Sequence, residues 1–420
     1  MKVFKFGGAS VNSIERIQQA GRILQQYSGE PLVIIISAMG KTTNALEKVT
    51  EAFYAGNKEE ALELFHVVKN QHINTAKYLL VTQFNECLAQ LNDFFTEVEW
   101  LLHDKPVRDY AYYYDQVVCA GELLSTAIIS HYLTETNIRN KWLDVRDILR
   151  TDDNFRDANI DWTYTTAKVN DYLQPLLKDN TFVITQGFIG STDENESTTL
   201  GREGSDYTAA IFANILNAEN LSIWKDVEGV MSADPKQFPD AVYLHELSYN
   251  EVIEMAYYGA QVIHPKTIKP LQNKNIPLHV KCFLDASLPG TIISSKRVKG
   301  LPPIIVLKEN TVLMYMRSHD FSFVGEQPIS ALYKKLGELS IKPNLLQTGA
   351  ISLQICLDDR SDKIEQLAAA AGDLFDIQLE KGLTLLTIRH YTPELLTAML
   401  TGKEIVLQQQ TQETVQVLYR

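Results

Sequence analysis

The sequence is poor in cysteine and in long apolar runs. Only four cysteines occur in 420 residues, Cys87, Cys119, Cys282 and Cys356, and they lie far apart without paired spacing. That pattern matches neither a zinc ligand set nor a secreted disulfide framework, so we expect reduced thiols. No stretch approaches the roughly 18 to 20 apolar residues of a membrane span, and the N-terminus runs into glycines. We therefore expect a cytoplasmic protein with no membrane partner.

Positive charge is also in deficit. The chain has 39 Lys and Arg against 52 Asp and Glu, which gives a formal net charge of -13. Such a field repels polyanions and argues against a nucleic-acid partner, so any bound phosphate must be held by a local site. The hydrophobic share of 45% and the charged share of 22% are those of an ordinary folded protein. Its length predicts two or three domains.

Up to about residue 298, buried-strand patterns alternate with helical ones. The strand candidates are short, largely apolar runs at residues 2–6, 32–36, 182–185, 221–224 and 276–280. Residues 44–109 contain no proline before Pro106 and predict several helices, and residues 207–216 predict another. Strands that alternate with helices indicate an α/β fold with a mainly parallel sheet covered on both faces.

A change of pattern follows the Gly and Pro residues at 299–303, which mark the best domain boundary. Strand patterns at 304–316, 351–357 and 383–388 enclose helical patterns at 329–336 and 362–370. This order predicts a small βαββαβ unit, followed by an incomplete second unit that ends in a strand at 414–419.

Three polar loops follow predicted strands. Residues 5–10 combine Lys5 with Gly7 and Gly8, whose missing side chains would let phosphate approach the backbone, although a plain strand-to-helix turn reads the same way. Residues 198–206 lead into a helix, where Asp206 would also serve as an ordinary N-cap. Residues 224–236 form the third loop, and its alternative interpretation is a pair of turns with solvated charges. Each loop alone is weak, and the combination favours a phosphate site.

These loops resemble, in order, the motif set of aspartate kinases, members of the amino acid kinase superfamily. The matching segments cover nearly all of residues 1–295 and lie at residues 5–10, 37–46, 120–125, 183–190, 201–206, 224–236 and 258–265. The resemblance implies an α/β three-layer sandwich at 1–298 as the catalytic domain. It also implies an α+β regulatory region at 303–420 that resembles ACT units, the small βαββαβ ligand-binding fold, with one complete and one truncated unit.

The resemblance assigns roles residue by residue. It implies phosphorylation of the L-aspartate β-carboxylate by ATP with Mg²⁺, without a metal site built from protein side chains. The implied catalytic residues are Lys5, Gly7, Gly8 and Asp206. The implied aspartate-binding residues are Ser37, Thr43, Glu122, Arg202 and Ser205. The implied ATP-binding residues are Lys5, Gly7, Gly8, Ser10, Lys225, Asp226, Met231, Lys236 and Gln261.

Several positions depart from the family pattern. Glu203 stands where a glycine is usual, and Gln261 stands where a nucleotide-binding lysine is common. In the ACT-like region, Asn344 and Asp320 replace an acidic residue and a glycine of the lysine pocket, so we predict weak inhibition by lysine or none. The family further implies a homodimer formed through this region.

Two other functions remain open from the sequence. One is another small-molecule kinase of the same superfamily, such as a glutamate or acetylglutamate kinase. The second is an amino-acid sensor whose kinase domain has decayed and whose ACT-like region does the work. Lys5, Arg202, Asp206 and Asp226 are all retained, which favours a working kinase.

Overall fold

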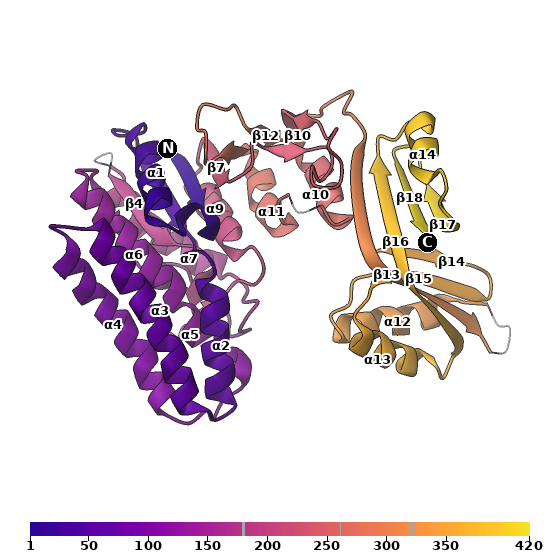
Figure 1. Ribbon diagram of the computed structural model, residues 1–420, viewed down its shortest axis with the longest axis horizontal. Helices are drawn as coiled ribbons and strands as arrows, with labels where there is room; N and C mark the ends of the chain where they lie inside the picture. The colour runs from indigo at the N-terminus through magenta and orange to yellow at the C-terminus, as the bar shows by residue number, and fades with distance from the viewer. Residues whose placement is uncertain (179–180, 261, 320–322) are drawn as a thin grey trace. The chain divides into compact units, whose positions relative to one another are not determined.

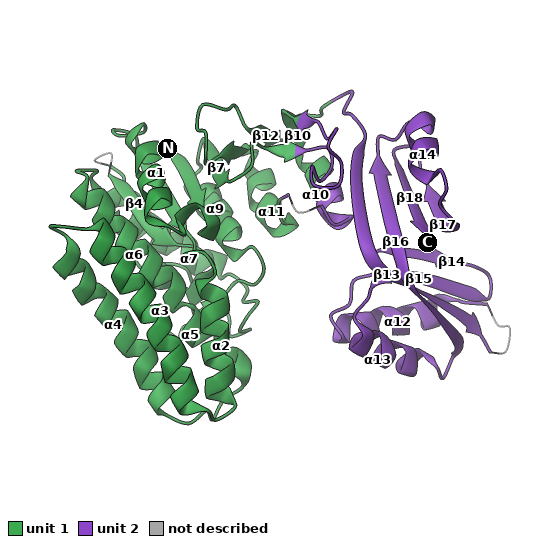
Figure 2. Cartoon of the chain, in the orientation of Figure 1, with its two compact units in different colours: residues 1–230, 244–253, 263–298 green, residues 231–243, 254–262, 299–420 purple. Residues whose placement is uncertain are grey.

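The computed structural model describes residues 1–178, 181–260, 262–319 and 323–420. The chain forms two compact units, coloured separately in Figure 2. Unit 1 comprises residues 1–230, 244–253 and 263–298, and unit 2 comprises residues 231–243, 254–262 and 299–420. Two short segments that precede residue 299 therefore belong to unit 2.

Unit 1 is built on an eight-stranded sheet in the order β10-β12-β11-β7-β1-β2-β4-β3. Its neighbours are parallel except for the pair β11 and β12, which confirms the mainly parallel sheet. Every residue of β2 and β4 is buried, because apolar, β-branched runs suit strands covered on both faces. The strands are β1 Lys2–Phe6, β2 Leu32–Ile36, β3 Asn140–Trp142, β4 Phe182–Gln186, β7 Asn220–Lys225, β10 Glu246–Ser248, β11 Leu278–Cys282 and β12 Thr291–Ser294.

Helices lie on both faces of this sheet, which gives the predicted three layers (Figure 1). Helix α9 packs on β1, β2 and β7 beside α11, whereas α6 packs on β2 and β4 beside α1. The helices that begin in unit 1 are α1 Ile14–Gln25, α2 Thr42–Tyr54, α3 Lys58–Leu79, α4 Phe84–His103, α5 Tyr110–Val118, α6 Ala120–Glu135, α7 Trp162–Lys168, α8 Gln174–Leu176, α9 Gly204–Ile215, α10 Tyr249–Tyr257 and α11 Pro265–Lys274. Short helical turns occur at η1 Gly8–Val11, η2 Val145–Asp147 and η3 Val169–Leu173, and small two-stranded pairs at β5 Ile189–Ser191 with β6 Ser197–Thr199 and β8 Val230–Met231 with β9 Tyr243–Leu244.

The first helix shows how local sequence starts an element. The Ser13 side chain accepts a hydrogen bond from the Arg16 backbone N–H and caps α1. Its apolar residues recur at helical spacing on one face, with Ile17, Ile23 and Leu24 buried.

One stretch, Tyr110–Glu135, is long and apolar enough to cross a membrane by length and composition, contrary to our expectation from the sequence. It comprises α5 and α6, and 83% of its most apolar window is buried inside the structure. A helix that is apolar on all sides is expected in the core of a large domain.

Unit 2 contains a six-stranded sheet in the order β14-β15-β13-β16-β18-β17, antiparallel throughout. Helices α12 and α13 pack with one end of this sheet and α14 with the other, so the region is α+β and consistent with an ACT-like fold. The elements are β13 Ile304–Ser318, α12 Glu326–Glu338, β14 Leu345–Thr348, β15 Ser352–Asp358, α13 Ser361–Ala371, β16 Phe375–Arg389, α14 Pro393–Leu400, β17 Ile405–Gln410 and β18 Thr414–Tyr419.

The two long strands of unit 2 serve two separate cores. Strands β13 and β16 pair along their length, from Ile304 opposite Arg389 to Ser318 opposite Phe375, with register shifts after Lys308. The half of β13 beyond that irregularity packs with α12 and α13, whereas the first half packs with β18 and α14. The first βαββαβ unit is therefore inserted within the second, instead of preceding it along the chain.

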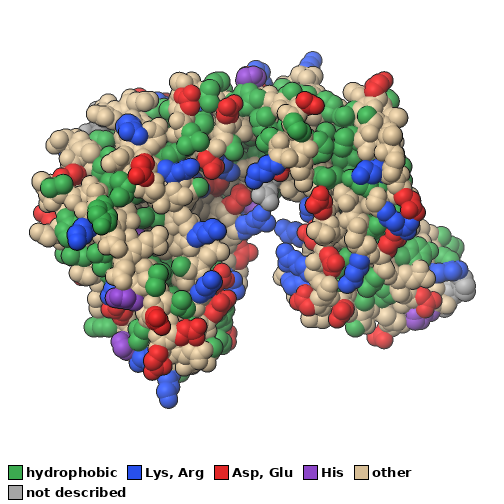
Figure 3. All heavy atoms as spheres, in the orientation of Figure 1, with side chains coloured by type: hydrophobic (Ala, Val, Ile, Leu, Met, Phe, Trp, Pro, Cys, Tyr) green, Lys and Arg blue, Asp and Glu red, His purple; other side chains and the backbone are tan. Residues whose placement is uncertain are grey.

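The visible surface carries both signs of charge. Figure 3 shows Lys and Arg side chains interspersed with Asp and Glu side chains on both units. On this face acidic and basic side chains are mixed, so a local cationic site is compatible with the negative net charge of the chain.

Candidate active site

A cavity of about 540 Å³ lies at the carboxyl ends of the central strands of unit 1. Strands β2, β1 and β7 are parallel neighbours, so the loops that follow them meet at one edge of the sheet, where ligands bind in open α/β folds. The cavity is lined by Lys5, Gly8, Ser37, Ala38, Gly40, Thr43, Tyr114, Glu122, Arg156, Phe188, Thr199, Gly201, Arg202, Glu203, Gly204, Ser205, Asp206 and Lys225.

Glycine lets the loops after β1 and β2 touch. A Cβ on Gly8 would lie 2.6 Å from the Ala38 carbonyl oxygen, and the Gly40 N–H donates to the Gly8 carbonyl at 3.0 Å. A Cβ on Gly7 would lie 3.5 Å from Lys5 Nζ. Gly8 is thus required for packing, and Gly7 leaves space for an anion beside the Lys5 ammonium group.

An ion pair at the centre of the cavity joins β1 to α9. Lys5 Nζ lies 2.5 Å from Asp206 Oδ1, and both side chains are largely buried. Burial by itself would raise the pKa of Asp206, but the ammonium groups of Lys5 and Lys225 outweigh it and hold the pKa below its ordinary value. Asp206 is therefore ionised, and it fixes the Lys5 ammonium group at the mouth of the glycine loop.

The N-terminus of α9 lines the same cavity, and Glu203 is the residue that precedes it. Glu203 has a left-handed backbone with φ of 56°, the conformation that favours the glycine usual in the family. Its side chain accepts a hydrogen bond from the His264 backbone N–H at 2.9 Å. The carboxylate is thus engaged by a backbone donor, while Ser205 and Asp206 lie in the first helical turn, where the helix dipole favours anions.

Glu122 on α6 is a buried carboxylate with a spare acceptor. Its Oε1 atom accepts from the Ala38 N–H at 3.2 Å. Its Oε2 atom is buried and has no hydrogen-bond partner among the residues that the structure describes. Burial raises the pKa of Glu122 to about 8, although hydrogen bonds from the backbone of Ala38 and of Glu122 itself and the charge of Lys5 oppose the increase. A ligand cation would satisfy Oε2 and return the group to its ionised form.

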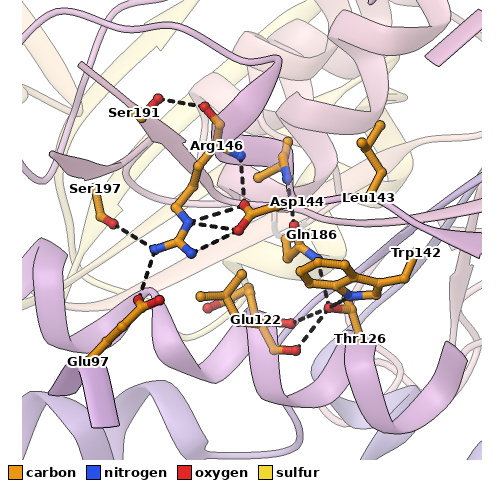
Figure 4. A network of polar contacts seen from close by, with 12 residues as sticks. Glu97, Glu122, Thr126, Trp142, Leu143, Asp144, Arg146, Gln186, Ser191 and Ser197 are labelled. Carbon is orange, nitrogen blue, oxygen red and sulfur yellow. Dashed lines mark hydrogen bonds and ion pairs between the residues drawn. The ribbon is translucent and has the colours of Figure 1, made fainter. Parts of the chain in front are cut away.

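A buried polar network holds the helical turn that carries Glu122 (Figure 4). Thr126 Oγ1 donates to the Glu122 carbonyl at 2.8 Å and accepts from Trp142 Nε1 and Gln186 Nε2. Gln186 Oε1 in turn accepts from the Val145 N–H at 2.7 Å. Because Gln186 ends β4, this network fixes Glu122 relative to the central sheet.

The same network extends to the β5–β6 pair (Figure 4). Arg146 makes several hydrogen bonds to Asp144 and reaches Ser197 with Nη1 at 3.3 Å, and Ser191 Oγ donates to the Arg146 carbonyl at 2.6 Å. The ion pair with Asp144 and Glu97 raises the pKa of Arg146 against the opposing effect of burial. β6 leads directly to Arg202, so the network supports both predicted ends of the substrate pocket.

All five predicted aspartate-binding residues line the cavity. Ser37 follows β2, Thr43 lies in the first turn of α2, and Glu122 lies on α6. Arg202 and Ser205 flank the start of α9. No hydrogen bond or ion pair of Arg202 is found within the described part of the chain, so its guanidinium group is available to a ligand. Tertiary folding thus brings these separate segments to one place.

The predicted nucleotide-binding residues are more dispersed. Lys5, Gly8 and Lys225 line the cavity, and Gly7 precedes Gly8. The others differ in position: Ser10 is buried with its hydroxyl donating to the Trp224 carbonyl, Asp226 is exposed in the turn after β7, Met231 and Lys236 belong to unit 2, and Gln261 lies outside the described residues.

Several cavity-lining residues had no predicted role in the site. Among them are Tyr114, Arg156, Phe188 and Thr199. A buried Asp115 behind them also lacked any sequence signal, because nothing in the run of tyrosines on α5 distinguishes a buried carboxylate from an exposed one. The phenylalanine lay within a recognised motif, whereas the arginine belonged to a loop without one.

Comparisons with known proteins agree with this geometry. Residues 1–282 match the model of the amino acid kinase family. The chain is 29% identical over 417 residues to lysine-sensitive aspartokinase 3 of Escherichia coli (strain K12), covering 96% of this chain and 89% of that protein. It is 31% identical over 403 residues to chloroplastic aspartokinase 3 of Arabidopsis thaliana, covering 92% of this chain and 70% of that protein.

A solved structure is similar over the full chain. It is that of E. coli aspartokinase III in complex with aspartate and ADP, with a TM-score of 0.83, 26% sequence identity, and coverage of 100% of this chain and 96% of that chain. The chain therefore belongs to the amino acid kinase family and, within it, to the aspartokinases.

Proposed function

We propose that the protein is an ATP-dependent aspartate kinase that transfers the γ-phosphoryl group to the β-carboxylate of L-aspartate, the first step toward lysine, threonine and methionine. The observation that carries this proposal is the buried Lys5–Asp206 pair, which lies in one cavity with Arg202 and Glu122. A cation for the phosphoryl group, a guanidinium for a carboxylate and a carboxylate for an ammonium group match an acidic amino acid and a phosphate donor.

The chemistry needs mainly positioning and charge stabilisation. The aspartate β-carboxylate is already ionised at neutral pH, with an ordinary pKa near 3.9, so no general base is required. Lys5 would neutralise charge on the transferring phosphoryl group, and Asp206 would hold Lys5 in place. Arg202 would bind the α-carboxylate, and Glu122 Oε2 would accept from the substrate ammonium group.

Mg²⁺ would accompany ATP. In phosphoryl transfer Mg²⁺ is usually held by phosphate oxygens, waters and one or two carboxylates. The donor set of the cavity fits that mode, since Asp206 is an ionised carboxylate beside Lys5. Within the described residues no group of three or more His, Cys, Asp or Glu side chains could hold a metal ion, so the phosphates would supply most of the ligands.

Further properties belong to the same proposal. The ATP site would also use Ser10, Asp226, Met231, Lys236 and Gln261, as the family resemblance implies. The family resemblance likewise supports a cytoplasmic homodimer that pairs through the ACT-like region. Size-exclusion chromatography with light scattering would test the dimer.

The test of the proposed function is a phosphorylation assay. Purified protein is incubated with ATP, Mg²⁺ and either aspartate, glutamate or N-acetylglutamate, and hydroxylamine traps the acyl phosphate. We expect hydroxamate with aspartate, loss of product after chelation of the metal, and recovery when Mg²⁺ is restored. Product with glutamate or N-acetylglutamate alone would indicate another kinase of the family, and no product with any substrate would indicate a decayed sensor.

A further inference from the structure

Three cavity-lining residues have a backbone conformation that ordinary side chains avoid. Among the described residues that are neither Gly nor Asn, positive φ occurs at Arg156 (71°), Phe188 (73°), Glu203 (56°), Ser340 and His390. The first three line the cavity. Such conformations persist only where the surrounding structure enforces them, and they gather at functional sites. Glu203 and Phe188 lie in recognised motifs, so Arg156 is the one that remains unexplained.

A buried carboxylate holds the backbone of Arg156. Asp115 Oδ2 accepts from the Arg156 N–H at 2.9 Å and from the Thr199 N–H at 2.8 Å, and Oδ1 accepts from Thr199 Oγ1 at 2.7 Å. Asp115 is fully buried, and Thr199 also lines the cavity. One side chain therefore fixes two walls of the cavity and keeps Arg156 in its left-handed conformation.

The guanidinium group of Arg156 is oriented by an aromatic ring and has only a weak contact with a carboxylate. Its central carbon lies 4.3 Å from the ring centroid of Tyr114, a distance suited to a cation–π contact. Its Nη2 atom lies 3.6 Å from Glu47 Oε1, beyond ordinary hydrogen-bond length. The side chain is 45% exposed. Tyr114 thus orients a cation at the cavity whose anionic partner can be exchanged.

Arg156 and Arg202 come from abutting backbone segments. A Cβ on Gly201, the residue before Arg202, would lie 3.2 Å from the Arg156 carbonyl oxygen. Lys5, another cation that lines the cavity, is paired with Asp206 at the phosphoryl end. Both arginines line the cavity, so two guanidinium groups come from adjoining backbone segments. Paired guanidinium groups suit a carboxylate, which offers two acceptor oxygens.

We propose that Arg156 is a substrate-binding and specificity-determining residue that, together with Arg202, binds the α-carboxylate of the amino-acid substrate in exchange for Glu47. This inference rests on the proposed aspartate kinase activity and adds a second guanidinium to its substrate pocket. It explains why a left-handed conformation is tolerated at an arginine: the backbone geometry directs a cation into the cavity.

The test uses a substrate pair that differs only at the α-carboxylate. L-Aspartate α-amide keeps the ammonium group and the reacting β-carboxylate of aspartate and lacks the α-carboxylate. Arg156→Asn is the informative variant because asparagine tolerates positive φ. We expect the KM for aspartate to rise about tenfold or more, the scale of one charge-assisted hydrogen bond. The KM values for the α-amide and for ATP should stay unchanged. Glu47→Gln should lower the KM for aspartate, because it removes the competing carboxylate.

The chain supplies a matched control in Arg108. Its guanidinium lies 3.8 Å from the Tyr112 ring centroid, it pairs with Glu196, and its side chain is 44% exposed, yet it does not line the cavity. Arg108→Asn and Glu196→Gln should leave every KM unchanged. Equal KM increases for aspartate and its α-amide in Arg156→Asn would overturn the proposal in favour of a structural role. An increase confined to ATP would reassign the residue to the nucleotide, and no difference from Arg108→Asn would also overturn it.

Calorimetric binding of aspartate and of the α-amide separates this inference from the proposed function. If wild-type protein yields no aspartyl hydroxamate, the kinase proposal fails, while the ratio of the two Kd values still tests Arg156. The ratio of the α-amide Kd to the aspartate Kd should fall in Arg156→Asn but stay above one, because Arg202 still distinguishes a carboxylate from an amide. A ratio equal to that of the wild type would exclude Arg156 as an α-carboxylate ligand.

Discussion

Replacing Glu122 by glutamine tests the electrostatics of the cavity without changing its shape. The carboxamide oxygen can continue to accept from the Ala38 N–H, as Oε1 does at 3.2 Å. The change removes only the ionisable group, which in the ligand-free protein is buried with one oxygen lacking a hydrogen-bond partner among the described residues. The variant therefore isolates the cost of an unpaired buried charge.

The magnitude follows from the pKa of Glu122, which burial raises from an ordinary 4.5 to about 8. Because the folded-state pKa lies above the unfolded one, the wild type has stability at low pH that it loses as the pH rises through 4.5 to 8. Each pKa unit corresponds to about 1.36 kcal/mol, so the total loss is about 5 kcal/mol. Of this, about 3 kcal/mol is lost between about pH 6 and pH 9.

The assay compares melting temperatures of wild type and Glu122→Gln without substrate across that pH range. The variant has no carboxylate to ionise, so its advantage should grow by about 3 kcal/mol, or about 6 °C for a unit of this size. A difference in melting temperature between variant and wild type that stays the same across this pH range would refute the buried, unpaired carboxylate. Aspartate binding gives the functional side: binding near neutral pH should release about one proton as the substrate ammonium group ionises Glu122, and the variant should release none.

Four further predictions concern catalysis, binding, positioning and control. Lys5→Met should lower kcat by about 100-fold or more and change the KM for aspartate little, because the charge of Lys5 matters most during phosphoryl transfer. Steady-state kinetics on the folded variant test this, and a near-normal kcat would remove Lys5 from the catalytic residues. Arg202→Ala should weaken aspartate binding by about 1.5 to 3 kcal/mol with the effect on the aspartate KM preceding any on the ATP KM; a defect limited to ATP would reassign the residue. Glu203→Gly should leave the left-handed turn intact and lose only the hydrogen bond to His264, so activity should stay within about threefold; inactivation of a stable variant would contradict that view. Millimolar lysine should inhibit weakly or not at all, since the Asn344 side chain carries no charge and is already hydrogen-bonded to Lys308 and Asp358. The assay measures activity at subsaturating aspartate with lysine, threonine, methionine and lysine plus threonine. Sigmoidal inhibition by lysine alone would contradict the prediction.

Some predicted positions meet different outcomes in the structure. Asp320, which entered the argument on lysine, lies outside the described residues, as does Gln261. Glu203 avoids the anion site because its carboxylate turns to the His264 N–H. His264 caps the start of α11, because its side chain accepts from the Lys266 N–H at 3.2 Å.

The sequence by itself determined the elements whose cause is local. Strands β1, β2 and β18 have the predicted bounds, because short runs of alternating or β-branched apolar residues end at turn residues. The cap of α1 at Ser13 also has a local cause, because serine is a preferred N-cap residue. The motif set also identified Lys5, Arg202 and Asp206, since glycine loops before helix starts leave a recognisable order of residue types.

Tertiary structure alone decided what depends on contacts between distant segments. The left-handed conformation of Arg156 is imposed by Asp115, 41 residues earlier, and no local pattern could reveal it. Strands β14 and β17 and helix α14 escaped prediction, because short, half-exposed elements are stabilised by neighbours rather than by their own periodicity. The nesting of the two ACT-like units likewise arises from the pairing of β13 with β16, whose register is fixed only when residues 304–318 and 375–389 meet.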